Sequence, residues 1–315
     1  HESILVWLKA SNVNVDNGGL VLSWPDNSQH GMPIVIENYP AWHDRILNNH
    51  PVVRFNSSLM QSLTLASDES NVLSRVFGGG NVLSKSFTVF VVLRFMGSGD
   101  GAKFSFFSAS NSASQDDLFN FAVNSVGSFA EYRIQTVINA NVIYSTDRKI
   151  TADKSFAILA MVHDGFSVYL YKDGTVNPMV QQHDLESAEG ARPYVRPVKK
   201  NDMDGMIGMI NSVRIGSVAL NSSMTQFFQG DVAEVLVYDT DLVSVDIDRV
   251  GSYLSRKYRL LWQVTTGPQV TAIAPCNGPA VGGTLVTVFG SQLSDASSRI
   301  RAQVRGTNCT DIVVL

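Results

Sequence analysis

The residues best suited to acid–base chemistry form a short acidic segment, Asp184-Leu-Glu186-Ser-Ala-Glu189. Hydrolysis of a glycosidic bond with retention needs two carboxyl groups held about 5 to 5.5 Å apart, one of them acting as the acid. The segment is polar and lacks the alternation of a strand that would fix such a separation. We therefore interpret it as a solvated acidic loop.

Two further arrangements resemble catalytic pairs but have the wrong geometry. Asp231 and Glu234 lie on an apolar strand, and side chains three residues apart on a regular strand point to opposite faces. We expect no catalytic pair there, and we assign Glu234 a structural hydrogen bond or ion pair. His163 and Asp164 are adjacent and diverge, and no serine lies in a nucleophile elbow, so we interpret His163 as a turn residue.

Oxygen-bearing side chains alternate in Asn201-Asp202-Met203-Asp204-Gly205. Asn201, Asp202 and Asp204 could bind a hard cation such as Ca²⁺, although the other ligands of an EF-hand loop are missing. A plain polar loop is the alternative. A weaker acidic group consists of Asp116, Asp117 and Asn120.

Aromatic rings that lie beside polar groups can stack on sugars. Of the four tryptophans, Trp42 is the candidate, because Tyr39-Pro-Ala-Trp-His-Asp44 predicts a loop that would expose the ring. We therefore name Trp42 as a glycan-binding candidate.

Composition excludes several classes of protein. The chain has 315 residues, of which 44% are hydrophobic and 17% charged, and its net charge is -4. This is the composition of a globular protein. Without a long run of Lys or Arg, a nucleic-acid partner is not expected, and no apolar stretch approaches the roughly 18 residues that a membrane-spanning helix needs.

The cysteines and the glycosylation signals favour the secretory route. Cys276 and Cys309 are the two cysteines, and we expect them to form a disulfide. The loop of roughly 33 residues that it closes would remove about 3.5 kcal/mol of unfolded-chain entropy. Three Asn-x-Ser/Thr sequons begin at Asn56, Asn221 and Asn308. Because the chain starts at His1, we expect a mature or trimmed secreted protein, located extracellularly or at the cell surface.

The elements that must position these residues are almost all strands. Apolar runs at 87–95, 156–162, 166–171, 212–215 and 231–238 are separated by Asp-Gly and other polar turns, which predicts an antiparallel β-sandwich. A surface helix follows, with Ser244 as its expected N-cap and with Ile247, Val250 and Leu254 on one face. A linker near residue 265 precedes a different pattern, with strands expected at 270–273 and 285–289.

The first 262 residues or so resemble the laminin-G/concanavalin A-like modules of large extracellular proteins. The resemblance rests on six segments: 5–10 (LVWLKA), 23–28 (SWPDNS), 51–55 (PVVRF), 87–92 (FTVFVV), 170–174 (LYKDG) and 228–238 (FQGDVAEVLVY). It implies a jelly-roll sandwich, core positions for Trp7 and Trp24, and in some members a calcium ion. Glucanases of this fold carry Glu-x-Asp-x-x-Glu, whereas the order of the first two acids is reversed at 184–189.

The remainder resembles the opening of an IPT/TIG domain, which has an immunoglobulin-like fold. The segment 268–275 (PQVTAIAP), the glycines at 278 and 282–283 and the segment 286–290 (VTVFG) carry this resemblance. We therefore expect a first domain at 1–264 and a truncated IPT/TIG domain at 265–315. An incomplete sandwich exposes strand edges, so we expect the chain to be cut from a longer one.

Three functions compete. The first is a non-enzymatic structural or adhesive module of a cell-surface or matrix glycoprotein, including a subunit of a fibre or appendage. The second is a carbohydrate-binding lectin assisted by Ca²⁺, and the third is a glycoside hydrolase of the same fold. Fold alone does not separate them. Glycans, other extracellular proteins or further copies of the chain are the expected partners, and we expect no enzyme.

Overall fold

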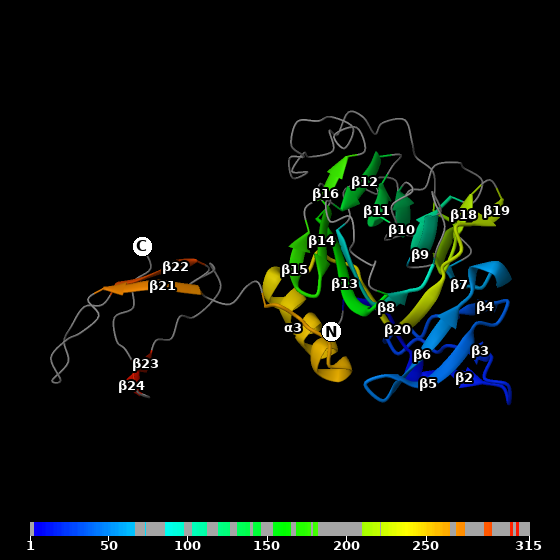
Figure 1. Ribbon diagram of the computed structural model, residues 1–315, viewed down its shortest axis with the longest axis horizontal. Coiled ribbons are helices and arrows are strands. Elements are labelled where there is room, and N and C mark those ends of the chain that lie inside the picture. Colours follow the sequence, from blue (N-terminus) through cyan, green and yellow to red (C-terminus); the bar gives the residue numbers. More distant parts are fainter. Residues whose placement is uncertain are drawn as a thin grey trace. The chain divides into compact units, whose positions relative to one another are not determined.

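The chain folds into two compact units, His1–Gln263 and Val264–Leu315. The computed structural model describes residues 3–66, 73, 86–97, 103–111, 119–126, 131–138, 141–145, 154–164, 168–177, 179–181, 210–220, 222–264, 269–274, 287–291, 303–304 and 307–308. The described part of the first unit consists mainly of strands, and a long helix, α3, lies near its end (Figure 1). The boundary predicted from the sequence lies one residue further along the chain.

One large sheet, the β20 sheet, has strands in the spatial order β15-β14-β13-β8-β20-β6-β5, with β1 also paired to β20. Its turn at Asp173 and Gly174 has positive φ at both residues, as a tight hairpin turn requires. Strands β13, β14 and β15 accordingly form an antiparallel meander. The strands are β1 (Ile4–Lys9), β5 (Ala41–Leu47), β6 (His50–Phe55), β8 (Phe87–Phe95), β13 (Phe156–His163), β14 (Val168–Lys172), β15 (Thr175–Asn177) and β20 (Gly230–Tyr238).

The second large sheet, the β17 sheet, has the order β16-β12-β11-β10-β9-β17-β7-β4. Its strands are β4 (Val35–Glu37), β7 (Ser62–Ala66), β9 (Lys103–Ser110), β10 (Phe119–Val126), β11 (Glu131–Ile138), β12 (Asn141–Ser145), β16 (Met179–Gln181) and β17 (Ser212–Ile215). Smaller elements are η1 (Ala10–Asn12), η2 (Ser57–Leu59) and the hairpins of β2 (Asn14–Val15) with β3 (Val21–Ser23) and of β18 (Val218–Leu220) with β19 (Ser223–Thr225).

The main core lies between the two sheets. Along β8, the alternate residues Phe87, Val89, Val91, Leu93 and Phe95 point into it, which is the period of two expected of a strand. Phenylalanine rings interlock there. The ring centroids of Phe106 and Phe121 are 4.2 Å apart, and those of Phe87 and Phe119 are 4.9 Å apart. Each buried ring contributes about 2 to 3 kcal/mol. This arrangement confirms the predicted all-β sandwich.

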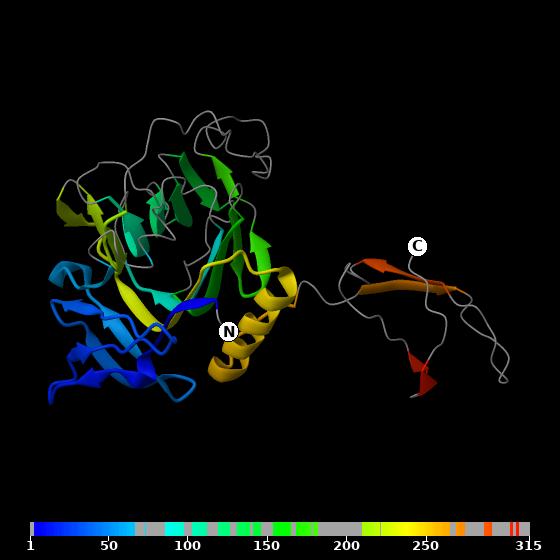
Figure 2. The same ribbon diagram turned by 180° about the vertical axis from the view of Figure 1, so that it is seen from behind.

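The outer face of the β20 sheet is covered in part by α3 (Ser244–Tyr258). Ile247, Leu254 and Tyr258 pack there on residues of β8 and β13, and Figures 1 and 2 show the helix alongside this sheet. The predicted helix face is confirmed. The predicted N-cap is wrong, because the extended residue Val243 takes that position and Ser244 is already the first helical residue.

The chain leaves this unit along a fixed path. The N–H of Gln263 donates to the carbonyl of Asp173 over 2.7 Å, and the Thr175 hydroxyl donates to the Gln263 side chain over 3.0 Å. Gly174 makes this approach possible, since a Cβ there would lie 2.0 Å from the carbonyl oxygen of Gln263. The exit segment is thereby tied to the turn between β14 and β15.

The second unit contains two strand pairs in its described part. Strand β21 (Gln269–Ala274) pairs with β22 (Thr287–Ser291), and β23 (Gln303–Val304) pairs with β24 (Thr307–Asn308). Both larger strands overlap the two predicted from the sequence. No helix in the described part of the chain is long and apolar enough to span a membrane.

Replacing Gly251 with alanine should destabilise the fold, although alanine is the better helix former by about 1 kcal/mol. An added Cβ would lie 2.0 Å from Cε2 of Trp262, whose ring packs against the helix. We expect a loss of about 1 to 3 kcal/mol in the free energy of unfolding, measured by urea denaturation. Val245→Ala, at a position that is 40% exposed on the same helix, is the control and should change little. Equal or greater stability of Gly251→Ala would contradict this packing.

Candidate functional site

Strand β20 carries two fully buried carboxylates, Asp231 and Glu234. A register shift against β8 between residues 232 and 234 marks a β-bulge. Val232 and Val235, on either side of it, pack between the two sheets. Ala233 and Leu236 pack in the layer that α3 covers. The bulge places both carboxylates on the α3 face. The prediction that they point to opposite faces is therefore wrong, because it assumed a regular strand.

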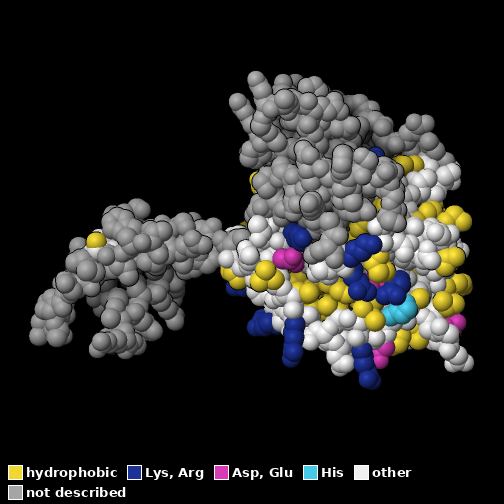
Figure 3. Space-filling view, viewed as in Figure 1, with side chains coloured by type: hydrophobic (Ala, Val, Ile, Leu, Met, Phe, Trp, Pro, Cys, Tyr) yellow, Lys and Arg dark blue, Asp and Glu magenta, His cyan; other side chains and the backbone are white. Residues whose placement is uncertain are grey.

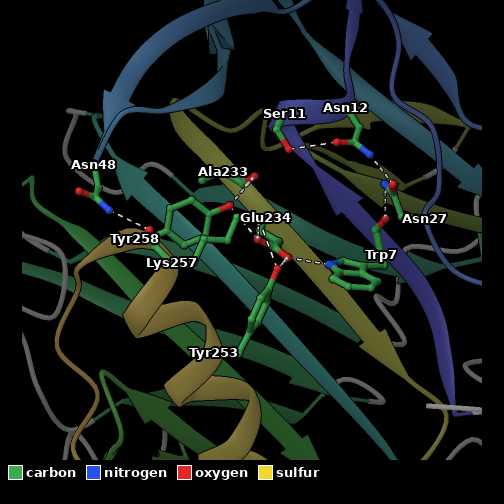
Figure 4. A network of polar contacts seen from close by, with 10 residues as sticks. All are labelled: Trp7, Ser11, Asn12, Asn27, Asn48, Ala233, Glu234, Tyr253, Lys257 and Tyr258. Carbon is green, nitrogen blue, oxygen red and sulfur yellow. Dashed lines mark hydrogen bonds and ion pairs between the residues drawn. The ribbon is translucent and has the colours of Figure 1, made fainter.

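The carboxylate of Glu234 is the centre of a buried polar network (Figure 4). It accepts hydrogen bonds from Nε1 of Trp7 at 2.6 Å, the hydroxyl of Tyr253 at 3.0 Å, Nζ of Lys257 at 2.7 Å and the hydroxyl of Tyr258 at 2.7 Å. Each oxygen thus receives two donors. Because Trp7 lies on β1 and the other donors lie on α3, the network ties both elements to β20. The structural role predicted for Glu234 is confirmed.

Burial and the charge of Glu234 keep the two tyrosine donors protonated. Burial raises the pKa of Tyr258 and Tyr253 well above the ordinary range, and the negative charge of Glu234 raises both further. Nζ of Lys9 lies 3.5 Å from the centroid of the Trp7 ring. Burial lowers the pKa of Lys9, and Glu234 opposes that shift. This cluster therefore stabilises the packing of β1 and α3 on β20.

Asp231 is held by two arginines. Arg54 donates through Nε at 2.7 Å and through Nη2 at 3.1 Å, and Arg94 donates through Nε at 3.0 Å and also through Nη2. The side chains of Arg54 and Arg94 are 32% and 25% exposed, whereas that of Asp231 is fully buried. The carboxylate is therefore unavailable as a base, and the group presents positive charge to solvent.

The outer face of the β17 sheet is polar across neighbouring strands. One row follows the pairing register in the order Val35, Thr64, Arg214, Ser108 and Asn120. The four polar members are at most 7% exposed. Each buried polar group needs a hydrogen-bond partner, so we expect another polar segment to pack on this row.

The chain around the β18–β19 hairpin supplies some of those partners. The carbonyl of Ser217 accepts a hydrogen bond from Ser108 at 2.8 Å. The amide of Asn120 donates to the side chain of Gln226 at 3.0 Å and accepts from Ser105 at 2.6 Å. Asn120, which the sequence grouped with acidic residues, is therefore part of this hydroxyl and amide network.

An ion pair lies at one end of the same face. Arg214 pairs with Glu37, and its Nε donates to the Ser217 hydroxyl at 2.9 Å. Glu37 accepts further hydrogen bonds from Ser62 at 2.7 Å and from Thr64 at 2.8 Å. Burial alone would raise the pKa of Glu37, but Ser62, Arg214 and Thr64 together outweigh it and lower the pKa. Glu37 is thus held as a carboxylate.

The structure corrects the placement of Trp42. It lies on β5, paired with Val53, and not in a loop as predicted. Its ring is half-buried against the inter-sheet core, and its Nε1 donates to the carbonyl of Ala10 at 3.0 Å. Trp42 therefore belongs to the edge of the core, and its role as a glycan-binding residue stays a prediction.

Other predicted residues have more ordinary places. Trp24 is buried in the main core, and His163 stacks on Phe87 with centroids 5.1 Å apart. The side chain of Asn56 accepts a hydrogen bond from the N–H of Ser58 at 3.0 Å, and Asn308 lies on β24. Several candidates lie outside the described residues: Asn201, Asp202, Asp204, Asn221, Cys276, Cys309, Asp116, Asp117 and the acidic segment 184–189. Among the described residues, no group of three His, Cys, Asp or Glu side chains could hold a metal ion.

Sequence reasoning missed the two arginines on the outer face of the β20 sheet. Arg54 and Arg94 each interrupt an apolar strand, Pro51–Phe55 and Phe87–Phe95 respectively. A single charged residue in such a run has to be paired when its neighbours bury most of its side chain. That signal was present, but it does not identify the partner strand.

Comparison with known families matches residues 268–314 to the IPT/TIG domain. This confirms the predicted immunoglobulin-like segment, and the predicted laminin-G resemblance stays a prediction. No curated protein matches the chain.

Solved structures that align with the chain include Trypanosoma rangeli sialidase, at 13% identity and a TM-score of 0.49, over 82% of this chain and 33% of that one. Domain 4 of AbnA, an extracellular arabinanase from Geobacillus stearothermophilus, aligns at 13% identity and a TM-score of 0.46, over 79% of this chain and 98% of that one. The receptor binding domain of botulinum neurotoxin mosaic serotype C/D aligns at 8% identity and a TM-score of 0.44. That alignment covers 80% of this chain and about half, 51%, of the toxin chain.

Neutralising Glu234 should lower the stability of the folded protein. Glu234→Gln removes the charge that compensates Lys257 and cannot accept from all four donors, so we expect the free energy of unfolding to fall by about 3 to 5 kcal/mol. Asp246→Asn is the control, because the Asp246–Arg249 pair lies at the surface with Arg249 70% exposed, and it should cost less than about 1 kcal/mol. Equal losses in the two variants would contradict the central role of Glu234.

Glu37 should make the stability of the folded protein depend on pH. Its pKa is lowered from 4.5 in the folded protein, so its contribution is present above about pH 4.5 and is lost as the pH falls through the folded pKa. Urea denaturation from pH 6 to pH 2.5 should show a steeper loss for the natural chain than for Glu37→Gln. Parallel curves would show that the carboxylate contributes no such linkage.

Proposed function

We propose that this chain is a non-enzymatic binding module of an extracellular protein, with a structural or adhesive role. A β-sandwich followed by an IPT/TIG segment supports this proposal, because neither part requires a reaction centre in order to serve as a recognition surface. The proposal includes secretion, glycosylation at the sequons, the Cys276–Cys309 disulfide and association with other extracellular proteins or with copies of the chain.

One observation carries the non-enzymatic part of the proposal. The buried carboxylates of the described strands are occupied by cations and hydroxyl donors: Glu234 by Lys257 and its neighbours, and Asp231 by Arg54 and Arg94. A hydrolase needs one carboxyl group that can protonate a leaving group and a second that can attack or activate water. Neither Asp231 nor Glu234 has an oxygen left to do so.

Carbohydrate recognition is the second candidate function. The exposed margin of the polar outer face of the β17 sheet favours it, because apolar side chains beside ordered polar groups can pack on a sugar ring. Two exposed apolar side chains flank this face, Val35 at 58% and Met224 at 42% exposure. The Met224 sulfur contacts Arg214, so this residue lies at the margin of the row. Assistance by Ca²⁺ at Asn201, Asp202 and Asp204 belongs to this second proposal.

A glycan array tests the two candidates with the full chain, once with Ca²⁺ and once with a chelator. Selective binding would support carbohydrate recognition, and its loss on chelation would support a calcium-dependent site. Met224→Ala and Val35→Ala should then weaken binding by about 5- to 10-fold, whereas Leu261→Ala, at a residue 64% exposed elsewhere, should not. No binding in either condition would leave the adhesive role, and cleavage of a bound glycan would overturn the non-enzymatic proposal.

A further inference from the structure

A row of side chains crosses five strands of the β20 sheet in register. Phe156 of β13 pairs with Arg94 of β8, Arg94 with Asp231 of β20, Asp231 with Arg54 of β6, and Arg54 with Ala41 of β5. Since neighbouring strands lie about 4.8 Å apart, this Arg54–Arg94 row is about 19 Å long. It forms a continuous band on one face of the sheet.

The row lies on the outer face but outside the part that α3 buries. The helix packs on Phe90, Ile158 and Leu236, whereas the arginines of the row keep 25% to 32% of their side-chain surface exposed. On the face drawn in Figure 3, Lys and Arg side chains gather beside a histidine and among hydrophobic side chains. A partly exposed band suits an extended ligand better than a small molecule, which binds in an enclosed pocket.

The row keeps a net positive charge and hydrogen-bond donors that Asp231 does not use. Two arginines and one aspartate give 2 − 1 = +1, and Asp231 accepts only from the Nε and Nη2 atoms. A guanidinium has five N–H donors. Within the described residues, Nη1 of Arg54 and Nη1 of Arg94 make no hydrogen bond. Asp231 therefore fixes two planar donor groups whose remaining N–H atoms are directed away from it.

Neighbouring groups keep this arrangement rigid. The Phe156 ring lies 4.6 Å from Cζ of Arg94 and supports one face of that guanidinium. His43 follows Ala41 by two residues on β5 and so shares its face. Burial lowers the pKa of His43, and Arg54 lowers it further while Asp231 opposes the shift, which leaves this histidine uncharged at neutral pH. The net charge of the band therefore stays at that of the ion cluster.

Backbone pairing narrows the class of ligand. At the position of the row, β8, β20 and β6 are each paired on both sides, so a peptide cannot add a strand there. Recognition has to use the guanidinium groups and the surface beside them. A fixed pair of guanidiniums matches the planar or tetrahedral oxyanions of carboxylate and sulfate groups. A polymer that repeats such a group can contact the length of the row.

We propose that the Arg54–Arg94 row is a binding site for an acidic polysaccharide bearing sulfate or carboxylate groups. The site lies on the opposite sheet from the polar face considered for neutral sugars. It deepens the carbohydrate-recognition candidate and rests on it.

Binding of the full chain to dextran sulfate, polygalacturonate, poly-glutamate and neutral dextran at 50 and 300 mM NaCl tests this site. We expect dextran sulfate or polygalacturonate to bind, and the higher salt concentration to weaken that binding. Arg54→Gln and Arg94→Gln should each raise the dissociation constant at least about 10-fold. Arg249→Gln makes the same charge change on α3 and should leave the constant within about 2-fold.

A second variant guards against loss of folding. Asp231→Asn keeps both arginines and leaves an amide oxygen that can still accept hydrogen bonds from them. Because it also raises the charge of the row from +1 to +2, it should bind at least as tightly as the natural chain. Weaker binding by a folded Asp231→Asn would overturn the site, as would unchanged binding by folded Arg54 and Arg94 variants. Equal binding of poly-glutamate, or an equal loss in Arg249→Gln, would show general charge attraction and would also overturn it.

The result also separates this site from the broader proposal. If neutral glycans on the array bind and the acidic polymers do not, the site falls and carbohydrate recognition stands. If no glycan of either kind binds, both fall, and the adhesive role remains.

Discussion

The fold of the first unit depends on how one carboxylate is desolvated. A charged group taken out of water costs several kcal/mol unless hydrogen bonds and an opposite charge replace the lost hydration. Glu234 meets that requirement with two donors on each oxygen, drawn from β1 and from α3. Elements from the two ends of the domain are therefore held by the same side chain. The bulge in β20 is what brings Glu234 to the face where those donors lie.

The two sheets use in-register arginines in different ways. On the β17 sheet, Arg214 is buried and its partners Glu37, Ser62 and Ser217 surround it. On the β20 sheet, Arg54 and Arg94 share a single buried carboxylate and remain partly exposed. Opposite strand neighbours make such rows possible, because side chains at the same register lie about 5 Å apart on one face. Burial then decides whether a row stabilises the sheet or presents charge.

Much of the fold follows from local patterns in the sequence. The apolar run at Phe87–Phe95 is a strand with those limits, and the apolar spacing of Ile247 and Leu254 gives the buried face of α3. These features depend on periodicity, which neighbouring residues determine. The Ser244 cap was missed by one residue, since helix ends depend on backbone geometry that several residues can satisfy.

The sites were less predictable, because they depend on pairing between distant strands. Asp231 and Arg94 are 137 residues apart in sequence, and nothing in either segment specifies the other. The bulge that turns Asp231 and Glu234 to one face is a change of register against β8, so it is visible only once the partner strand is known. The predicted loop at Trp42 was wrong for a similar reason, because the turn-like residues before it are followed by a strand that pairs with β6.

The contact of Gln263 with the β14–β15 turn has a mechanical consequence. Tension on the C-terminal side of this unit would act first on the two hydrogen bonds that join Gln263 to Asp173 and Thr175. Helix α3 would come under load only after those bonds had broken. The meander of β13, β14 and β15 would therefore bear the first load from that side. The Glu234 network, which includes α3, would carry no load until those bonds had broken.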